Sequence, residues 1–255
     1  LNGKLCDAVV SRIGIRSIEF RGADGLYING KPFGDKLMGV NRHQDYAYIG
    51  NAVPNNLHWL DVKKMRDAGF RIIRSAHYPQ DPAFMDACDE LGMFIIVATP
   101  GWQYWNPEPV FEERILSDIR NMVRRDRNHP SVLLWEPVLN ETAFPESFAQ
   151  NAYRATHEEY PAPGCYAAID DKSKGAMGYD VVYTAPKNEA FYRNAGKSCF
   201  TREYGDCVDD WNSHNSYSRV AREWGEEPQI RQAQHYARKD YGGSLTVDQF
   251  YKSPR

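Results

Sequence analysis

The chain has 255 residues, of which 42% are hydrophobic and 25% charged, and its formal net charge is −3. This composition is typical of a globular protein with one large α/β domain or two small ones. The lack of a basic excess argues against a nucleic-acid partner. No apolar stretch approaches the ~18 residues that span a bilayer, so we expect no membrane segment.

The chain begins at Leu1 and no signal peptide is visible, so we expect an internal piece of a longer protein and assign no compartment. The five cysteines form no CxxC pair, and because their number is odd at least one is unpaired within the chain. We therefore do not expect a disulfide scaffold. Aromatic residues are frequent at 13%. They would serve either a large core or an aromatic-lined cleft for a polyhydroxylated ligand.

The first 25 residues do not follow the pattern of the rest. "GIRSIEF" (14–20) resembles the last strand of a preceding domain, and "GLYINGKPF" (25–33) predicts a hairpin that turns at Asn29 and Gly30. Asn-Gly is the dipeptide that two-residue hairpin turns favour. We therefore assign residues 1–25 to the end of a preceding domain or its linker, and residues 26–255 to the main domain.

Seven short apolar or β-branched runs follow, separated by segments with a helical pattern. The runs span residues 37–42, 70–76, 93–99, 131–137, 164–170, 180–186 and 198–205. One helix has clear end signals, with Asp81 at the N-cap, Pro82 at the first helical position and Gly92 just past the end. Strands that alternate with helices predict a parallel sheet, either an open doubly wound sheet or a (β/α)8 barrel.

The placement of polar residues favours the barrel. In most runs the polar or catalytic-type residues come at the carboxyl end, as with His77 after the second run and Asp170 at the end of the fifth. A barrel gathers these ends around one mouth. A nucleotide-binding open sheet would need a glycine-rich first turn, and the chain has neither GxGxxG nor GxxxxGK[ST]. We therefore predict an α/β fold of the (β/α)8, or TIM barrel, type.

Two glutamates sit at the ends of apolar runs, where an unpaired charge is costly to desolvate. Glu141 follows Asn140 after the fourth run, and Glu203 lies on the seventh, so a barrel would place the two across its mouth. Glycosidic bond cleavage usually needs two carboxyl groups that face each other across the anomeric carbon. A single glutamate at a strand end is more often a surface or salt-bridged residue, so spacing alone does not identify a reaction.

Four motifs in this order resemble the catalytic barrel of glycoside hydrolase family 2, the family of β-galactosidases and β-glucuronidases. They are "GVNRHQD" (39–45), "RSAHYPQDPAFMDACDELGMFIIV" (74–97), "NHPSVLLWEPVLNE" (128–141) and "TREYGD" (201–206). The resemblance covers most of the chain. It implies a retaining mechanism with Glu141 as general acid/base and Glu203 as nucleophile. It also implies a carbohydrate substrate, no cofactor, and further β-sandwich domains in a longer parent chain, of which residues 1–25 would be the end.

The two carboxyl groups should differ in pKa. Glu203 beside cationic groups such as Arg202 or Arg74 would stay ionised, whereas Glu141, facing that charge in a partly dry pocket, would have a raised pKa and hold its proton. Once Glu203 is glycosylated, the pKa of Glu141 should fall and the residue can act as a base towards water. We predict carboxyl groups about 5–5.5 Å apart, the separation of retaining enzymes.

The resemblance implies further residues of a sugar site. Asn140 is placed to bond the sugar 2-hydroxyl, Tyr183 matches a tyrosine that bonds the nucleophile, and several tryptophans are stacking candidates. The substrate-binding candidates beside Asn140 are Arg74, His77, His43, Tyr183, Trp102, Trp105 and Trp211. Without the motifs, each histidine is more often structural, and packing beneath a loop is as good an explanation for each tryptophan.

His43 and His77 near the glutamates also raise the question of a metal. Metal-dependent β-galactosidases of the family carry a carboxylate at the end of the third strand, where this chain has Thr99. We therefore expect no essential metal.

The chain departs from the family pattern in two places. The fourth-strand tryptophan of the family lies five residues before the acid, but Trp135 lies six before Glu141, which implies an inserted residue such as a bulge. This makes Glu136 a third carboxyl group to weigh, and we expect it to be a buried orienting or loop-anchoring residue. The tail at 241–255 contains neither a recognisable eighth strand nor a tryptophan, so we expect strand eight to be missing or truncated.

The tail also lacks the Asn-x-Lys element with which glucuronidases of the family hold the sugar carboxylate. This favours a β-galactosidase-like exo-β-glycosidase. The alternatives are a β-glucuronidase or another β-glycosidase of the same family, and a non-catalytic carbohydrate-binding barrel or inactive fragment. Cellulase-like endo-acting barrels share the two glutamates, but the histidine-containing motifs argue against them.

Overall fold

The computed structural model describes residues 3, 6–34, 37–46, 48–184 and 189–203. The chain divides into two compact units, one of residues 1–44 and 53–202 and the other of residues 45–52 and 203–255. All of the helices and strands below belong to the first unit.

The N-terminal elements form a small antiparallel sheet. It contains β1 (Ile18–Phe20), β2 (Leu26–Ile28) and β3 (Lys31–Pro32), with a short 3-10 helix, η1 (Gly22–Asp24), between the first two strands. The predicted turn is confirmed, since Asn29 (φ 52°) and Gly30 (φ 72°) both have left-handed backbone. Ile18 pairs with Ile28. The assignment of residues 1–25 to a preceding domain stays a prediction.

Seven parallel strands follow, and they confirm the seven predicted runs. They are β4 (Gly39–Arg42), β5 (Ile72–Ser75), β6 (Phe94–Ala98), β7 (Val132–Glu136), β8 (Ala168–Asp170), β9 (Val181–Thr184) and β10 (Ser198–Thr201). They pair in chain order as β4-β5-β6-β7 and β8-β9-β10. A parallel bridge between Trp135 and Ala167 joins the two groups.

This succession is that of a (β/α)8 TIM barrel. The expectation that strand eight is missing concerns a tail that lies outside the described residues.

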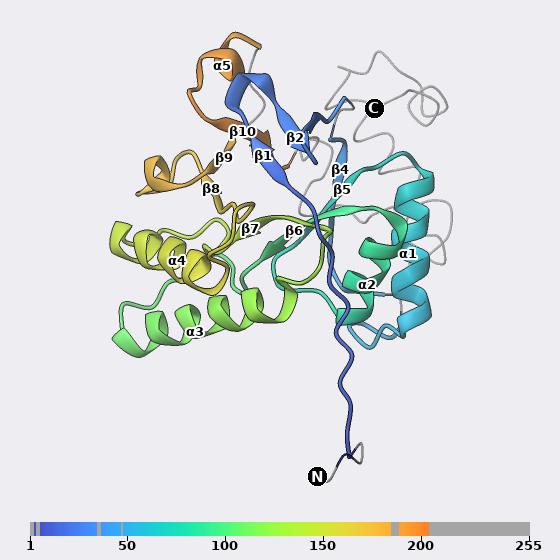
Figure 1. Ribbon diagram of the computed structural model, residues 1–255. Coiled ribbons are helices and arrows are strands. Elements are labelled where there is room, and N and C mark those ends of the chain that lie inside the picture. The colour runs from blue at the N-terminus through green and yellow to red at the C-terminus, as the bar shows by residue number, and fades with distance from the viewer. Residues whose placement is uncertain (1–2, 4–5, 35–36, 47, 185–188, 204–255) are drawn as a thin grey trace, which may run out of the picture. The chain divides into compact units, whose positions relative to one another are not determined.

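Helices cover the outside of the parallel strands (Figure 1). They are α1 (Asn55–Asp67), α2 (Pro82–Leu91), α3 (Pro109–Asp126), α4 (Glu146–Glu159) and the short α5 (Glu189–Asn194), with a 3-10 turn, η2 (Ala176–Gly178), after β8. Neighbouring helices pack in pairs, α1 on α2 and α3 on α4. The predicted ends of α2 are confirmed: the Asp81 carboxylate accepts a hydrogen bond from the Ala83 N–H at 2.8 Å, and Gly92 has left-handed backbone.

Strand residues alternate between two apolar layers. Side chains such as Ile73 and Ile95 face the helices, whereas Ile72 and Ile96 face the interior of the barrel. Ile18 of the N-terminal hairpin is part of the interior layer and closes the end where the strands begin.

A bulge in β7 determines which of its side chains face the interior of the barrel. Ile95 pairs with Val132 but Ile96 pairs with Leu134, so Leu133 is an extra residue in the strand. Both Leu133 and Leu134 belong to the interior layer. Side chains two residues apart on a regular strand share a face, so Glu136 lies on the same face as Leu134. The insertion predicted after Trp135 is therefore not found among the paired residues of β6 and β7. Val97–Trp135 and Ala98–Glu136 pair regularly, and the strand's bulge lies before the tryptophan.

Candidate active site

A buried ion pair joins the carboxyl ends of β5 and β7. Arg74 Nε lies 2.7 Å from Glu136 Oε2, and Arg74 Nη2 lies 2.6 Å from Glu136 Oε1. Both side chains are 3% exposed. Burying two charges is costly, and the bidentate geometry offsets much of that cost. The expectation that Glu136 is a buried orienting group is confirmed.

The ion pair helps to fix Asn140, which follows β7. Asn140 Oδ1 accepts a hydrogen bond from Arg74 Nη2 at 3.1 Å and another from Arg202 Nη1. A guanidinium group can only donate, so these two contacts determine which end of the amide is the oxygen. The amide nitrogen, Nδ2, therefore faces His77, whose Nε2 lies 3.4 Å away.

Glu141 is held beside Asn140 by the loop that follows β6. Glu141 Oε2 accepts hydrogen bonds from Trp102 Nε1 at 3.1 Å and from Gln103 Nε2 at 2.7 Å. Both ends of the second bond have left-handed backbone, with φ 48° at Glu141 and φ 56° at Gln103. Such a conformation costs a residue other than glycine on the order of 1 kcal/mol or more, and it is often found at functional sites.

The described neighbours lower the pKa of Glu141. The hydrogen bond from Trp102 contributes most, and burial acts against it, while the Gln103 hydrogen bond and the charges of Arg202 and His77 lower the pKa further. The raised pKa was expected from the negative charge of Glu203, which is not among these neighbours, so it stays a prediction; the hydrogen bonds donated to the carboxylate act in the opposite direction.

Asp170 and Arg202 complete this side of the site. The sequence placed Asp170 at a strand end and Arg202 beside Glu203, but it predicted no contact between the two and no role for them towards Glu141. Arg202 Nη2, just after β10, lies 3.0 Å from Asp170 Oδ2 at the end of β8 and 3.9 Å from Glu141 Oε1. Burial raises the pKa of Asp170, and the Arg202 charge opposes that rise. The predicted position of Asp170 at the carboxyl end of a strand is confirmed.

Three rings from different loops lie next to one another. The centroids of His43 and His77 are 5.7 Å apart, and those of His77 and Trp102 are 5.6 Å apart. Trp102 is 43% exposed, so its ring is accessible to a ligand. The ring of Trp105, on the same loop, has its centroid 4.8 Å from that of Phe148, which favours a packing role over stacking on a ligand.

Tyr183 on β9 is buried, and its hydroxyl group has no hydrogen-bond partner within the described part of the chain. The Arg74 guanidinium lies 5.9 Å from the centre of its ring. Burial raises the pKa of Tyr183 well above its usual range. Its hydrogen bond to the nucleophile stays a prediction.

The remaining two predicted residues are Glu203 and Trp211. Glu203 belongs to the second of the two units. Its partnership with Glu141 and the predicted distance between their carboxyl groups therefore stay predictions. Trp211 lies outside the described residues.

A cavity of about 630 Å³ opens beside Glu141. Its walls are the turn between β7 and α4 and the loop between β8 and η2. The lining residues are Glu136, Val138–Pro145, Asp170, Lys172–Lys174 and Arg202. Its size is within the range of small-ligand sites.

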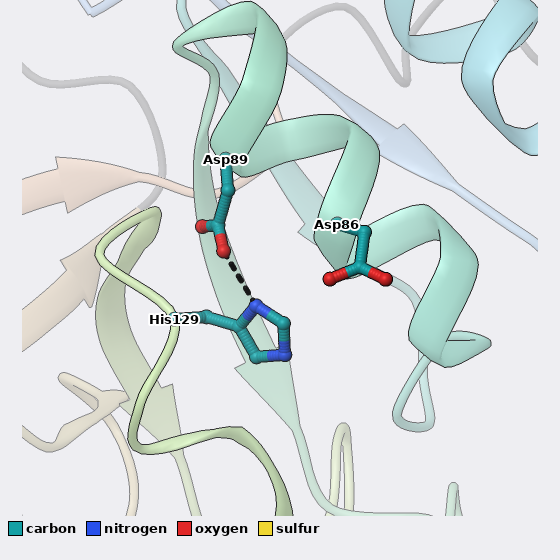
Figure 2. A group of neighbouring side chains, drawn as sticks. All are labelled: Asp86, Asp89 and His129. Atoms are coloured by element: carbon teal, nitrogen blue, oxygen red, sulfur yellow. Dashed lines mark hydrogen bonds and ion pairs between the residues drawn. The ribbon is translucent and has the colours of Figure 1, made fainter. Parts of the chain in front are cut away.

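Among the residues that the structure describes, one group has side chains suited to a metal ion: Asp86, Asp89 and His129. Figure 2 shows the imidazole of His129 directed at Asp89, with Asp86 beside them on α2. Asp89 Oδ2 lies 2.7 Å from His129 Nδ1, and Asp89 Oδ1 accepts the Ser131 N–H at 3.1 Å. Both oxygens of Asp89 are thus used in joining α2 to the start of β7, at the opposite end of the strands from Glu141.

The expectation of no essential metal stays a prediction. Within the described ranges, no helix combines the length and the apolar character needed to cross a membrane.

We predict that the buried ion pair is more sensitive to the loss of one partner than to the loss of both. Glu136→Gln removes the bidentate carboxylate partner of the buried Arg74 guanidinium and should lower the free energy of unfolding by about 3–5 kcal/mol. The double variant Glu136→Leu/Arg74→Met should lose less. Urea unfolding followed by circular dichroism measures both, and a double variant at least as destabilised as the single one would contradict the prediction.

We also predict that the contact between Asp89 and His129 contributes pH-dependent stability. The hydrogen bond that His129 donates to the Asp89 carboxylate raises the pKa of His129, which burial alone would lower. Burial would raise the pKa of Asp89, but the hydrogen bonds from His129 and Ser131 outweigh it and lower that pKa. The contribution should therefore be complete between the ordinary pKa values of about 4 and about 6.5. It should be lost above this window, as pH rises through the pKa of His129, and below it, as pH falls through that of Asp89.

The measurement is a double-mutant cycle with Asp89→Asn and His129→Gln. The coupling free energy should be about 1 kcal/mol near pH about 5.5 and smaller near pH about 9. Equal coupling at both pH values would show that the contact does not depend on the charge of His129.

Comparison with known proteins agrees with this geometry. The family model of the TIM barrel domain of family 2 glycosyl hydrolases matches residues 18–162. The β-galactosidase of Thermoanaerobacterium thermosulfurigenes is 37% identical over 157 residues, which are 61% of this chain and 21% of that protein. The chain thus spans about a fifth of the length of that curated relative.

Solved structures lead to the same family. A β-glycosidase from Bacteroides vulgatus is similar with a TM-score of 0.61 and 27% identity, over 73% of this chain and 25% of that one. A β-glucuronidase from Bacteroides uniformis is similar with a TM-score of 0.60 and 28% identity, over 67% of this chain and 23% of that one. The family match covers more than half of the chain and includes the strands that carry Arg74 and Glu136, so the chain belongs to glycoside hydrolase family 2.

Proposed function

We propose that the protein that contains this chain is a retaining exo-β-glycosidase, most similar in activity to a β-galactosidase, which removes terminal β-linked sugars from oligo- or polysaccharides. The observation that carries the proposal is the arrangement around Glu141. Its carboxylate accepts two hydrogen bonds from one loop and lies beside an amide that two arginines fix.

In the proposed reaction, Glu141 is the general acid and base and Glu203 is the nucleophile. Glu203 attacks the anomeric carbon while Glu141 gives its proton to the leaving oxygen, and the sugar becomes covalently attached to Glu203. Glu141 then takes a proton from the water that releases the sugar with retained configuration. The described neighbours lower the pKa of Glu141, so the first step requires the negative charge of Glu203 to raise it.

Asn140 is the proposed donor to the sugar 2-hydroxyl. Its Oδ1 is occupied by Arg74 and Arg202, which leaves Nδ2 as the group that can donate. A hydrogen bond to the 2-hydroxyl strengthens in the transition state of glycoside hydrolysis. His43, His77 and Trp102 would provide further contacts, with Trp102 as the exposed ring available for stacking.

The choice of a β-galactoside rests on the relatives. Several of them, such as the protein from T. thermosulfurigenes, are named β-galactosidases. The likeness to a β-glucuronidase supports β-glucuronides as the second candidate substrate. The small share of each relative that this chain covers supports further domains, such as β-sandwiches, in the parent protein.

We predict turnover of at least one chromogenic β-glycoside in a panel that includes the galactoside and the glucuronide. Glu203→Gln should reduce kcat by at least about 10⁴-fold, because it removes the nucleophile. Glu141→Gln should reduce kcat by about 10²–10⁴-fold, with a smaller loss for substrates whose leaving groups need little protonation. The exposed Glu113 on α3 supplies the matched control, since Glu113→Gln should leave kcat unchanged.

Two results would remove the proposal. One is no turnover of any β-glycoside by the protein, especially if it binds sugars, which would indicate a non-catalytic carbohydrate-binding barrel. The other is undiminished turnover by the Glu203→Gln variant. Products of inverted configuration, read by NMR early in the reaction, would keep a hydrolase but exclude the retaining mechanism.

A further inference from the structure

Glu141 lines the cavity described above, together with Asn140. A general acid must reach the oxygen of the bond that breaks, so the group attached to that oxygen has to fit next to its carboxyl group. The cavity walls at Val138–Pro145, Asp170 and Lys172–Lys174 enclose about 630 Å³ at this position. This step rests on the proposed function, since it takes Glu141 as the acid.

Three carboxyl groups line the cavity, those of Glu136, Glu141 and Asp170. The Glu136 carboxylate is paired with Arg74, and the Asp170 carboxylate with Arg202. Two further cations, Lys172 and Lys174, line the same cavity, and among the described residues neither forms an ion pair. When Glu141 carries the proton that the proposed reaction needs, these two lysines are the charges left without a counter-ion.

The loop that carries these lysines has a defined backbone. Asp171 N–H donates to the Tyr183 carbonyl at 2.8 Å, and Ser173 N–H donates to the Asp170 carbonyl at 3.0 Å. Gly175, with φ 82°, closes the turn, and an added Cβ there would lie 3.1 Å from the Cβ of Ala149 on α4. The lysines therefore extend from a turn that is hydrogen-bonded to β9 and packed on α4.

We propose that Lys172 and Lys174 recognise an anionic group, a carboxylate or a sulfate ester, on the part of the substrate that leaves. The natural substrate would then be a β-glycoside whose next sugar or aglycone is acidic, while the terminal sugar itself can be neutral. A cation that faces a substrate anion in a cleft lowers KM and makes it dependent on salt, because the attraction is electrostatic. The simpler alternative is that both lysines are solvated surface charges without a ligand.

The test compares nitrophenol leaving groups with and without an added anionic substituent, and the salt dependence and the variants isolate the effect of charge. The protein is assayed with the terminal sugar that it accepts, attached to 4-nitrophenol, to 3-carboxy-4-nitrophenol or to 3-sulfo-4-nitrophenol. The KM for the two anionic substrates should be about three- to tenfold lower than for the neutral one at low salt. The difference should shrink as the salt concentration rises.

Variants identify the residues responsible. Lys172→Gln/Lys174→Gln should bring the ratio of the neutral to the anionic KM close to one. Lys31→Gln, at an exposed position on β3, is the matched control and should keep the ratio. A larger effect on the carboxylate or on the sulfonate substrate would indicate which anion the site prefers.

The failures of the two proposals are distinguishable. Turnover with equal KM for neutral and anionic substrates, or a ratio that persists in the double variant, overturns the role of the lysines and leaves the glycosidase intact. No turnover of any of the β-glycosides overturns the proposed function and this inference with it.

Discussion

The site depends on a buried pair of charges, Arg74 and Glu136, which ties the ends of β5 and β7 together. Neither residue can be placed there alone, because an isolated charge in the interior of a barrel is far more costly than a paired one. The pairing fixes the position of the guanidinium group, and its Nη2 also donates a hydrogen bond to Asn140 Oδ1. The orientation of the amide beside the proposed acid thus follows from an electrostatic requirement of the core.

The remaining supports of Glu141 come from other strands. The loop after β6 supplies Trp102 and Gln103, and the end of β10 supplies Arg202, itself held by Asp170 on β8. A carboxylate with donated hydrogen bonds is stable in its charged form, which is why its pKa is low in this environment. The proposed mechanism therefore assigns Glu203 two tasks: attack on the sugar, and raising the pKa of Glu141 by its own charge.

Much of this fold could be predicted from local patterns. β-branched and apolar runs of strand length predicted all seven described parallel strands, and Asn29-Gly30 predicted the hairpin turn, because these signals depend on neighbouring residues. Local patterns could not predict the two ion pairs, Glu136 with Arg74 and Asp170 with Arg202. Each joins residues that are distant in the chain, so only the closed arrangement of strands determines them. The bulge at Leu133 escaped prediction because a hydrophobic residue fits either layer of the barrel.

The central claim is that Glu203 and Glu141 act as nucleophile and acid/base in a retaining reaction. The most direct measurement is to trap the covalent intermediate with a 2-deoxy-2-fluoro-β-glycoside of the accepted sugar that carries an activated leaving group, followed by mass spectrometry of the peptides. The account predicts one added sugar on the peptide that contains Glu203, and none in the Glu203→Gln variant. A label on Glu141 or Glu136 would contradict the account, as would turnover of the same reagent without any labelled peptide.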